Sequence, residues 1–349
     1  MSRHYPIKIC IFTSDLLEPF DEGVKKFANS VTQELAKTHL AKGLCLTGTQ
    51  SYPVKNTCAN RLLLSTTLRR EIQGFDPDAI LYFPNASANI FSLWRSRLLK
   101  FYAKKAKVVM VALQFQEHGS ISKKIMPLLM PDLIFVQSKK AHNNLSRLRA
   151  RVRIMPSAVN AQKFVPVKEE VKRSLRHKYG LDESAYIILH VGHISANRNL
   201  QALKKVQTDN RQQVLLVAST STGQDLRLVN DLQFQGIKII REYLPQIEQV
   251  YQLSDCYLFP VHCWSASIEM PFSVLEAMAC NLPVVTTRFG AIPDLFTEKN
   301  GIFLVDGDEE FQEKIQSAKN TVPKTRVLAK QFSWQKITYK LLTNIEEII

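Results

Sequence analysis

Two glutamates close together in the chain are the first candidates for chemistry. Glu269 and Glu276 stand seven residues apart in the stretch IEMPFSVLEAMACNLPVVTTRFG, which runs from Ile268 to Gly290. Seven residues make about two helical turns, so on one helix both carboxylates would point the same way. An apolar run typical of a buried strand follows directly. The spacing is therefore either a site above a short helix or a coincidence.

The composition is typical of a soluble globular protein, with 45% apolar and 22% charged residues. A chain of 349 residues exceeds the usual size of a single core, so we expect two domains. No apolar run approaches the roughly 20 residues that span a bilayer, and the start lacks a signal-type apolar core, so we expect a cytoplasmic location. The six cysteines form no C-x-x-C pair, which favours reduced thiols over a metal site or disulfides.

The net charge of +15 is unevenly distributed along the sequence. Residues 1–165 hold 25 Lys and Arg against 10 Asp and Glu, whereas the remainder holds 21 of each kind. All of the excess positive charge therefore lies in the first half, which points to an anionic partner for that half.

Apolar runs typical of strands alternate with amphipathic stretches along the whole chain. The predicted strands are 7–12, 44–48, 79–83, 107–113, 132–136 and 152–156 in the first half, and 186–192, 213–219, 237–240, 256–260, 283–287 and 302–305 in the second. Continuous apolar strands between helices predict an α/β fold of two successive doubly wound, Rossmann-like units with parallel sheets. We expect a linker at 163–168 and one cleft between the carboxyl ends of the two sheets.

The segment LEAMACNLPVVTTRFGAIPDLF resembles the signature of retaining, nucleotide-sugar-dependent glycosyltransferases of the GT-B fold, family four, also called group 1. Weaker similarities follow the same order along the chain: EGVKKFANSVTQEL, PSAVNAQKFVP, ILHVGHISANRNL, LPQIEQVYQLSDCYLFP and FSWQKI. The resemblance implies an N-terminal acceptor domain at 1–165 and a C-terminal nucleotide-sugar domain at 166–325. It also implies a last helix, within 326–349, that crosses back to the first domain.

The resemblance implies roles for both glutamates. Glu276 matches the glutamate that hydrogen-bonds the ribose of the nucleotide, a task that suits a carboxylate. The family's sugar-binding glutamate is spaced eight residues from it, where this chain has Ile268. Glu269 therefore either binds the sugar from a shifted register or only complements the dipole of the helix. A helix starting nearby would also direct backbone N–H groups at the donor phosphates. The residues at this helix start are Met270, Pro271, Phe272 and Ser273.

Other positions match the family's diphosphate and acceptor sites. Arg198 takes the place of a phosphate-binding lysine, and its planar fork suits phosphate oxygens. His193 takes the place of an arginine, and an imidazole carries less charge near neutral pH. Arg198 could instead be a solvated loop residue, and His193 a packed residue at a strand end. Gly23 alone remains of the family's paired glycines near the donor phosphates, although entry into a helix would also explain it.

A histidine at the reaction centre of many relatives is replaced here. Gln114 stands at the expected place, and a glutamine can bond a sugar hydroxyl but cannot relay a proton. His118 is the nearest histidine and is either functional or an ordinary loop residue. The DPD sequence at Asp76 to Asp78 has the spelling of a metal motif, but its setting is typical of a turn into a strand.

The resemblance implies a metal-independent transfer of a sugar with retention of configuration. The co-substrate would be a UDP- or GDP-linked sugar, with no other cofactor. The acceptor would be a glycan, a lipid-linked molecule or another anionic compound of cell-envelope or polysaccharide biosynthesis. Two alternatives remain, because several departures cluster at the site. One is a GT-B protein that binds a nucleotide or a partner without transfer, and the other is a GT-B epimerase or phosphorylase.

A basic stretch in the first half combines cations with aromatic residues. Phe91, Trp94, Leu98 and Phe101 recur at helical spacing, and five cations lie largely away from this stripe: Arg95, Arg97, Lys100, Lys104 and Lys105. A second basic cluster comprises Lys139, Lys140, Arg147, Arg149, Arg151 and Arg153. One interpretation is helices that cover the sheet and expose basic faces to solvent. The other is a peripheral contact with an anionic membrane at its inner face. No nucleic-acid-binding motif is present, so nucleic acid is not an expected partner.

Overall fold

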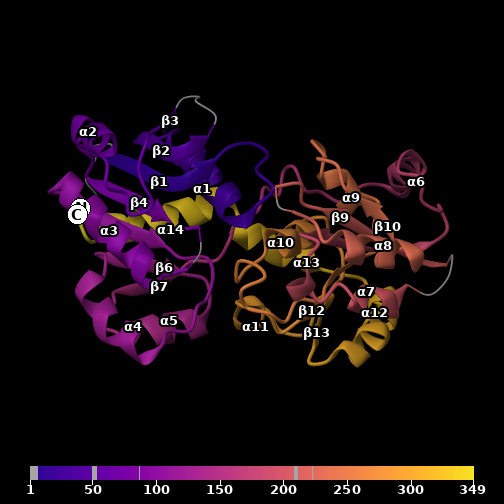
Figure 1. Cartoon of the computed structure of the whole chain (residues 1–349). Coiled ribbons are helices and arrows are strands. Elements are labelled where there is room, and N and C mark those ends of the chain that lie inside the picture. Colours follow the sequence, from indigo (N-terminus) through magenta and orange to yellow (C-terminus); the bar gives the residue numbers. More distant parts are fainter. Residues whose placement is uncertain (1–6, 49–52, 86, 208–210, 222) are drawn as a thin grey trace. The chain divides into compact units, whose positions relative to one another are not determined.

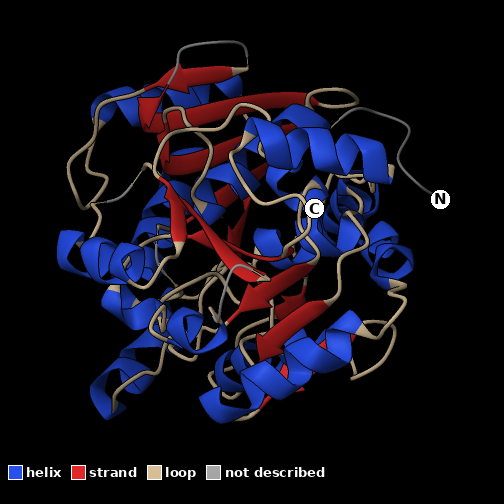
Figure 2. Cartoon of the chain, turned by 90° about the vertical axis from the view of Figure 1, so that its right-hand side faces the viewer, coloured by secondary structure: helices blue, strands red, loops and turns tan. Residues whose placement is uncertain are grey.

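The computed structural model describes residues 7–48, 53–85, 87–207, 211–221 and 223–349. The chain forms two compact units, which are coloured by position along the sequence in Figure 1. Unit 1 comprises Met1–Ser157 and Trp334–Ile349, and unit 2 comprises Ala158–Ser333. Each unit is built around one sheet, and Figure 2 shows strands flanked by helices.

The sheet of unit 1 is parallel and has seven strands in the order β3-β2-β1-β4-β5-β6-β7. They are β1 (Lys8–Leu16), β2 (Leu40–Gly48), β3 (Val54–Asn56), β4 (Ala79–Phe83), β5 (Lys107–Val111), β6 (Leu133–Val136) and β7 (Val152–Ile154). Every residue of the central strand β4 is buried, as expected of a strand covered by helices on both faces. The short edge strand β3 is the one strand of this sheet that the apolar pattern does not predict.

Helices connect the strands of unit 1. They are α1 (Gly23–Leu35), α2 (Thr66–Phe75), α3 (Ile90–Ala103), α4 (Ser120–Ile125), α5 (Lys139–Ser146) and the C-terminal α14 (Trp334–Glu346), with a 3-10 turn η1 (Met126–Leu129). Helix α14 packs on α1, where the rings of Phe27 and Trp334 meet edge to face with centroids 5.5 Å apart. The last helix therefore completes the unit that the N-terminus begins.

The sheet of unit 2 has six parallel strands in the order β10-β9-β8-β11-β12-β13. They are β8 (Tyr186–Gly192), β9 (Gln212–Ala218), β10 (Lys238–Ile240), β11 (Cys256–Phe259), β12 (Val284–Thr287) and β13 (Ile302–Val305). Alternate residues enter two separate cores, with Ile187 and Leu189 in one and Ile188 in the other. Both sheets thus have the doubly wound order, with the first strand of each unit inside the sheet and the switch point beside it.

Shorter helices surround this second sheet. They are α6 (Glu169–Lys178), α7 (Ala202–Val206), α8 (Leu226–Phe234), α9 (Glu248–Gln252), α10 (Phe272–Ala279), α11 (Ile292–Leu295), α12 (Phe311–Lys319) and α13 (Thr325–Ala329). Three 3-10 turns complete it: η2 (Ala196–Arg198), η3 (Asp308–Glu310) and η4 (Lys330–Phe332). None of the helices in the described ranges combines the length and apolar character needed to cross a bilayer.

The unit boundaries differ from those expected at residues 165 and 325. Val159 forms a bridge with Ser333, and Phe164 packs in the core of unit 2 with its ring against Tyr251. Helix α13, which begins at residue 325, packs on α10 of the same unit. The connecting segments therefore belong to unit 2, because their apolar side chains are buried there.

Helix α3 packs on the sheet through a face other than its aromatic stripe. Leu93, Ser96 and Leu99 face the interior, whereas three residues of the aromatic stripe are exposed to solvent: Phe91, Trp94 and Phe101. Lys100, one of the predicted surface cations, forms an ion pair with Asp132. The exposed face of this helix is therefore aromatic as well as basic.

Candidate active site

Arg198 lies just beyond the carboxyl end of β8, the central strand of unit 2. The strand ends at Gly192, and the turn η2 ends at Arg198 itself. The next residue, Asn199, adopts a left-handed conformation with φ 54°. Its amide Nδ2 donates to the carbonyl oxygen of Pro260 at 3.0 Å and to Oδ1 of Asp308 at 2.8 Å. These two bonds connect the residue after Arg198 to the loops that follow β11 and β13, and so fix the turn that carries Arg198.

The guanidinium of Arg198 is buried without a counter-charge. The residue is 6% exposed, and its Nε has no hydrogen-bond partner. Among the described residues, no carboxylate forms an ion pair with it. Burial lowers the pKa of Arg198 to about 10, with the nearby Tyr257 acting in the opposite direction, so the group stays charged at neutral pH. A buried, uncompensated cation is costly, and an anionic ligand would compensate it.

A histidine on β8 lies beside this arginine. His190 is fully buried, and its Nδ1 lies 2.8 Å from the carbonyl oxygen of Leu258. Burial lowers the pKa of His190 to about 4, and the charge of Arg198 acts in the same direction, against the effect of the Leu258 bond. The imidazole is therefore neutral at physiological pH.

The low pKa of His190 predicts a pH-dependent stability. An unfolded imidazole titrates near pH 6.5, so the unfolded chain binds the proton first as the pH falls. The free energy of unfolding should then fall below pH 6.5 and keep falling until about pH 4, by on the order of 1 kcal/mol per pH unit from this one group. Denaturant unfolding at pH 4.5, 5.5 and 7 should show a smaller fall for His190→Gln than for the wild type. Parallel curves for both proteins would contradict the buried neutral histidine.

Glu276 is buried on α10 and bound to a core tyrosine. Its Oε2 accepts a hydrogen bond of 2.8 Å from the hydroxyl of Tyr251, and the residue is 4% exposed. The rings of Tyr251 and Tyr257 have centroids 6.0 Å apart. The carboxylate of Glu276 is therefore the acceptor that a buried tyrosine needs.

Tyr257 connects Arg198 to the start of α10. Burial raises its pKa, hydrogen bonding from Ser273 lowers it, and the charges of Glu276 and Arg198 act on it in opposite directions. Its hydroxyl donates to the carbonyl oxygen of Val191 at 3.4 Å. The structure thus brings Arg198, Ser273 and Glu276 around one buried hydroxyl.

Helix α10 begins as the sequence predicts, but one carboxylate is left outside it. Pro271 is the N-cap residue and Phe272 the first helical residue. The residue before a proline disfavours the helical conformation, so the helix cannot extend back to Glu269. Met270, Pro271 and Phe272 are all buried. The two glutamates therefore do not share a helix, and the two-turn argument for their common direction does not apply.

Glu269 lies in the loop before α10 and has no exposed surface. Its carbonyl oxygen accepts a hydrogen bond of 2.8 Å from the backbone of Ala291. Gly290, with φ +56°, makes this approach possible, because a Cβ there would lie 2.1 Å from the same oxygen. The loop after β12 therefore fixes the backbone of Glu269.

Replacing Gly290 with alanine should destabilise the protein. The left-handed backbone and the clash with Glu269 together should cost about 2 to 4 kcal/mol of unfolding free energy. Gly74→Ala is the matched control, because that glycine lies in α2 and a Cβ on it would meet nothing within 4 Å. Chemical denaturation should show a large loss for the first substitution and none for the second. Equal stability of the two variants would contradict the described backbone of this loop.

The remaining predicted donor-site residues are less enclosed. His193 is partly exposed, one residue beyond β8. Gly23 opens α1 in unit 1, where Glu22 is the N-cap residue. In the first turn of that helix, Lys25 is buried and its Nζ lies 3.0 Å from a carboxylate oxygen of Asp15. The helix start that carries the single glycine thus also carries an ion pair between a buried lysine and a partly exposed aspartate.

Gln114 and His118 line one pocket in unit 1. Other lining residues include Ser87, Phe115 and Asn144, so the pocket lies at the carboxyl ends of β4 and β5 and beside α5. Burial lowers the pKa of His118, and the charge of Lys123 acts in the same direction. The structure therefore places both predicted acceptor residues at one position in the fold.

Sequence reasoning missed three residues of the arginine site: His190, Tyr251 and Tyr257. All three carry polar groups within apolar runs of the sequence. That feature could have identified them as candidate site residues. The DPD sequence has a structural task instead, since Oδ2 of Asp78 accepts from the backbone of Lys8 at 2.8 Å.

The sequence of unit 2 matches a known family. Residues 185–320 match the family model described as "Glycosyl transferases group 1". The chain is 27% identical to the sulfoquinovosyl transferase SQD2 of Arabidopsis thaliana over 46% of its own length and 31% of that protein. It is 23% identical to a D-inositol 3-phosphate glycosyltransferase of Paenarthrobacter aurescens (strain TC1) over 57% of its length and 52% of that protein. The matched segments thus span between about a third and a half of those relatives.

Solved structures match almost the whole chain. The Anabaena protein Alr3699/HepE in complex with UDP has a TM-score of 0.79 at 15% identity, covering 98% of this chain and 100% of that one. A glycosyltransferase from Rickettsia africae ESF-5 has a TM-score of 0.78 at 18% identity, covering 99% of each chain. At these identities the likeness shows the fold. The chain therefore has the GT-B fold, and its residues 185–320 match the model of the group 1 glycosyltransferases.

Proposed function

We propose that this protein transfers a sugar from a nucleoside diphosphate sugar to an acceptor hydroxyl, with retention of configuration and without a metal ion. The donor would be bound by unit 2, where the family match lies. A UDP-linked sugar is the first candidate, because the Anabaena relative was crystallised with UDP and with UDP-glucose. GDP-linked sugars are the second candidate.

The observation that carries this proposal is the buried guanidinium of Arg198. It lies at the carboxyl end of the central strand, at the switch point where ligands of doubly wound sheets bind. Because this guanidinium has no counter-charge among the described residues, it could bind an anion. A diphosphate carries the charge and the oxygen geometry that an arginine fork prefers.

The proposed reaction uses this charge in the bond-breaking step. The bond between the sugar C1 and the diphosphate oxygen breaks, and its electron pair stays on the diphosphate. The acceptor oxygen forms the new bond to C1 on the same face, and its proton passes to the departing phosphate. Negative charge on the diphosphate grows as the bond breaks, so a fixed cation beside it lowers the barrier.

Other residues take supporting roles in this proposal. Glu276 would accept a hydrogen bond from a ribose hydroxyl, and His193 would add a hydrogen bond to the phosphates. Glu269 would reach the sugar only after its enclosing side chains move, since it has no exposed surface. Within unit 1, Gln114 and His118 would contact the acceptor, and Gly23 would let a ligand approach the start of α1.

A panel of nucleotide sugars tests the proposal against its alternatives. UDP- and GDP-linked hexoses are incubated with the protein, and released nucleotide, free sugar and changed sugar are measured. Release of UDP or GDP with a retained anomer supports a retaining transferase. Binding without release would favour a nucleotide-binding protein, and an altered sugar still linked to nucleotide would favour an epimerase. Sugar 1-phosphate formed from a glycan and phosphate would favour a phosphorylase.

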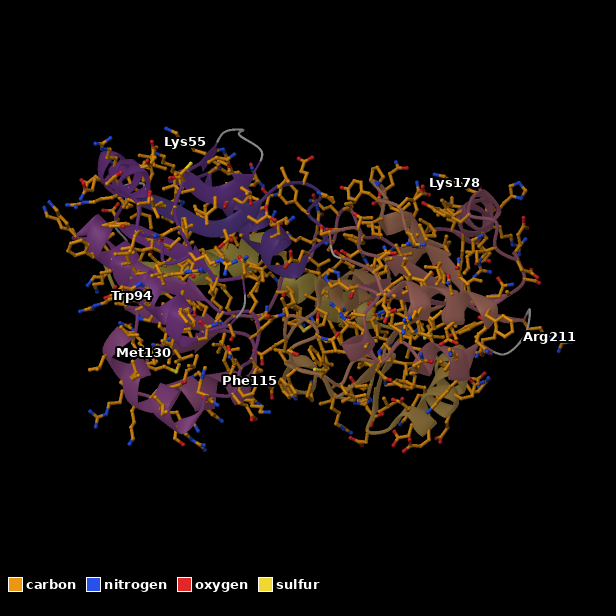
Figure 3. All side chains as sticks on the ribbon, viewed as in Figure 1. Lys55, Trp94, Phe115, Met130, Lys178 and Arg211 are labelled. Atoms are coloured by element: carbon orange, nitrogen blue, oxygen red, sulfur yellow. The ribbon has the colours of Figure 1, made fainter. Side chains whose placement is uncertain are left out.

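The acceptor side would include an anionic membrane surface, which the exposed face of unit 1 suits. Phe91 and Phe101 are 66% and 65% exposed on α3, and Figure 3 marks Trp94 on the same helix. The turn η1 packs beside α3, and α4 packs on η1. Three further exposed apolar residues lie on α4 and η1: Ile121, Ile125 and Leu128. Exposed cations accompany them: Arg97, Lys104, Lys105, Lys123 and Lys124. Aromatic rings favour the interfacial layer of a bilayer, and each nearby cation adds about 1 kcal/mol of attraction.

The protein should therefore co-sediment with vesicles that contain anionic lipid and not with purely zwitterionic ones. Raising salt from about 0.1 to 0.5 M should release it, since the Debye length shortens. The double variant Arg97→Glu, Lys105→Glu should reduce binding at least tenfold. Lys100 is a poor choice for charge reversal, because it pairs with Asp132.

The matched control reverses two exposed lysines of unit 2 in the variant Lys299→Glu, Lys324→Glu. This control should bind vesicles like the wild type. Equal binding to both vesicle types, or none to either, would argue for an acceptor away from membranes. Salt-sensitive binding to a nucleic acid duplex would instead point to the partner that the sequence did not favour.

A further inference from the structure

His190 presents a hydrogen-bond acceptor that has no donor. Its Nδ1 lies 2.8 Å from the carbonyl oxygen of Leu258, and a carbonyl can only accept, so Nδ1 carries the hydrogen. In the neutral imidazole, Nε2 is then a bare lone pair. This atom is buried and has no hydrogen-bond partner.

A donor without an acceptor lies on the same side of Gly192. A Cβ on this glycine would lie 2.9 Å from Nη1 of Arg198 and 3.3 Å from Nε2 of His190. The Nε of Arg198 is likewise buried without a partner. Glycine is needed between the two side chains because any Cβ would displace the guanidinium. Burying an unmatched donor beside an unmatched acceptor is costly, so a state that joins them has an energetic advantage.

We infer that His190 is a positioning residue for Arg198, and that its Nε2 accepts from one edge of the guanidinium when the other edge binds an anionic phosphate group. The inference rests on the proposed function of this site. Arginine presents five N–H donors in a rigid planar fork, so fixing one edge orients the opposite edge. A neutral imidazole is required for this role, since an imidazolium would repel the guanidinium and offer no lone pair. The burial that lowers the pKa of His190 to about 4 supplies that neutral form.

Two amide substitutions separate the two nitrogens of the ring. His190→Asn places an amide near the position of Nδ1, where it can still donate to Leu258, and removes the outer acceptor. His190→Gln places an amide oxygen near the position of Nε2. Titration calorimetry with UDP should show at least a tenfold loss of affinity for His190→Asn and no more than a threefold loss for His190→Gln. The reverse order, or equal losses, would overturn the inference, because the Leu258 bond or plain packing would then be what matters.

A double-substitution cycle tests whether His190 acts through Arg198. In the Arg198→Ala background, His190→Asn should cause no further loss of UDP affinity. Losses that add in full would overturn the inference. A wild-type protein that binds neither UDP nor GDP would overturn the proposed function, and this inference with it, whereas normal wild-type binding with additive losses removes the inference alone.

Gly192→Ala provides a test that leaves His190 unchanged. Its Cβ would press on the far end of the flexible Arg198 side chain, so the fold should persist while the guanidinium moves. UDP affinity should fall about as far as in Arg198→Ala. Unchanged affinity in a folded Gly192→Ala protein would overturn the account of how Arg198 is positioned.

Discussion

Replacing Arg198 with alanine should lower the rate of sugar transfer by about 100- to 1,000-fold, the size of effect seen when one preorganised charge-stabilising group is lost. The loss should be larger in kcat than in substrate affinity, because negative charge on the diphosphate grows toward the transition state. The unliganded variant should unfold at the same temperature as the wild type or higher, since it no longer buries an uncompensated cation. Steady-state kinetics and thermal unfolding without nucleotide measure the two effects.

Arg198→Lys is the control for this substitution. It keeps a positive charge but loses the planar fork, so it should recover part of the lost rate. A lower unfolding temperature for Arg198→Ala without nucleotide would show that the guanidinium has a structural partner, and would contradict its assignment as an anion-binding group.

Replacing Glu276 with alanine should weaken nucleotide binding by about 10- to 100-fold, which corresponds to the loss of a charged hydrogen bond of about 1.5 to 3 kcal/mol. Unlike an exposed site residue, it should also lower stability, because the buried hydroxyl of Tyr251 loses its acceptor. Calorimetric titration with UDP measures the first effect, and denaturant unfolding measures the second.

Tyr251→Phe separates the two roles of this carboxylate. It removes the hydroxyl that bonds Glu276 and leaves the carboxylate in place. We expect it to lower stability with little loss of nucleotide affinity, whereas Glu276→Gln should lower affinity with a smaller effect on stability. Unchanged UDP affinity in Glu276→Ala would remove this residue from the donor site.

The two doubly wound sheets follow from local patterns in the sequence. A central parallel strand must be apolar on both faces, so segments such as β4 and β8 read as continuous apolar runs. The edge strand β3 has three residues with no such run, and only its pairing with β2 makes it a strand. Edge strands of this kind are determined by tertiary contacts that sequence patterns do not carry.

The positions of candidate site residues were predictable where residue type alone restricts the local structure. Arg198 stands out in a loop after a strand, and Pro271 marks the start of α10. The burial of Glu269 and Glu276 was not predictable, because carboxylates are usually exposed and their enclosure depends on Tyr251 and Gly290, which come from other segments.

The aromatic stripe of α3 shows a similar limit of prediction from the sequence. Phe91, Trp94 and Phe101 have the spacing of a buried helical face, but another face, which includes Leu93 and Leu99, packs inward. Periodicity identifies the faces of a helix, but it does not determine which of two possible faces packs against the core. The outward aromatic face is therefore information that only the structure supplies, and it is what makes the vesicle experiment specific.

The most direct test of the central claim compares UDP with UMP as ligands of the wild type and of Arg198→Ala by titration calorimetry. If Arg198 binds the diphosphate, the wild type should bind UDP at least tenfold more tightly than UMP, and this preference should vanish in Arg198→Ala while UMP affinity changes little. A preference for UDP that survives the substitution unchanged would contradict the claim that the buried guanidinium at the end of β8 is the diphosphate site.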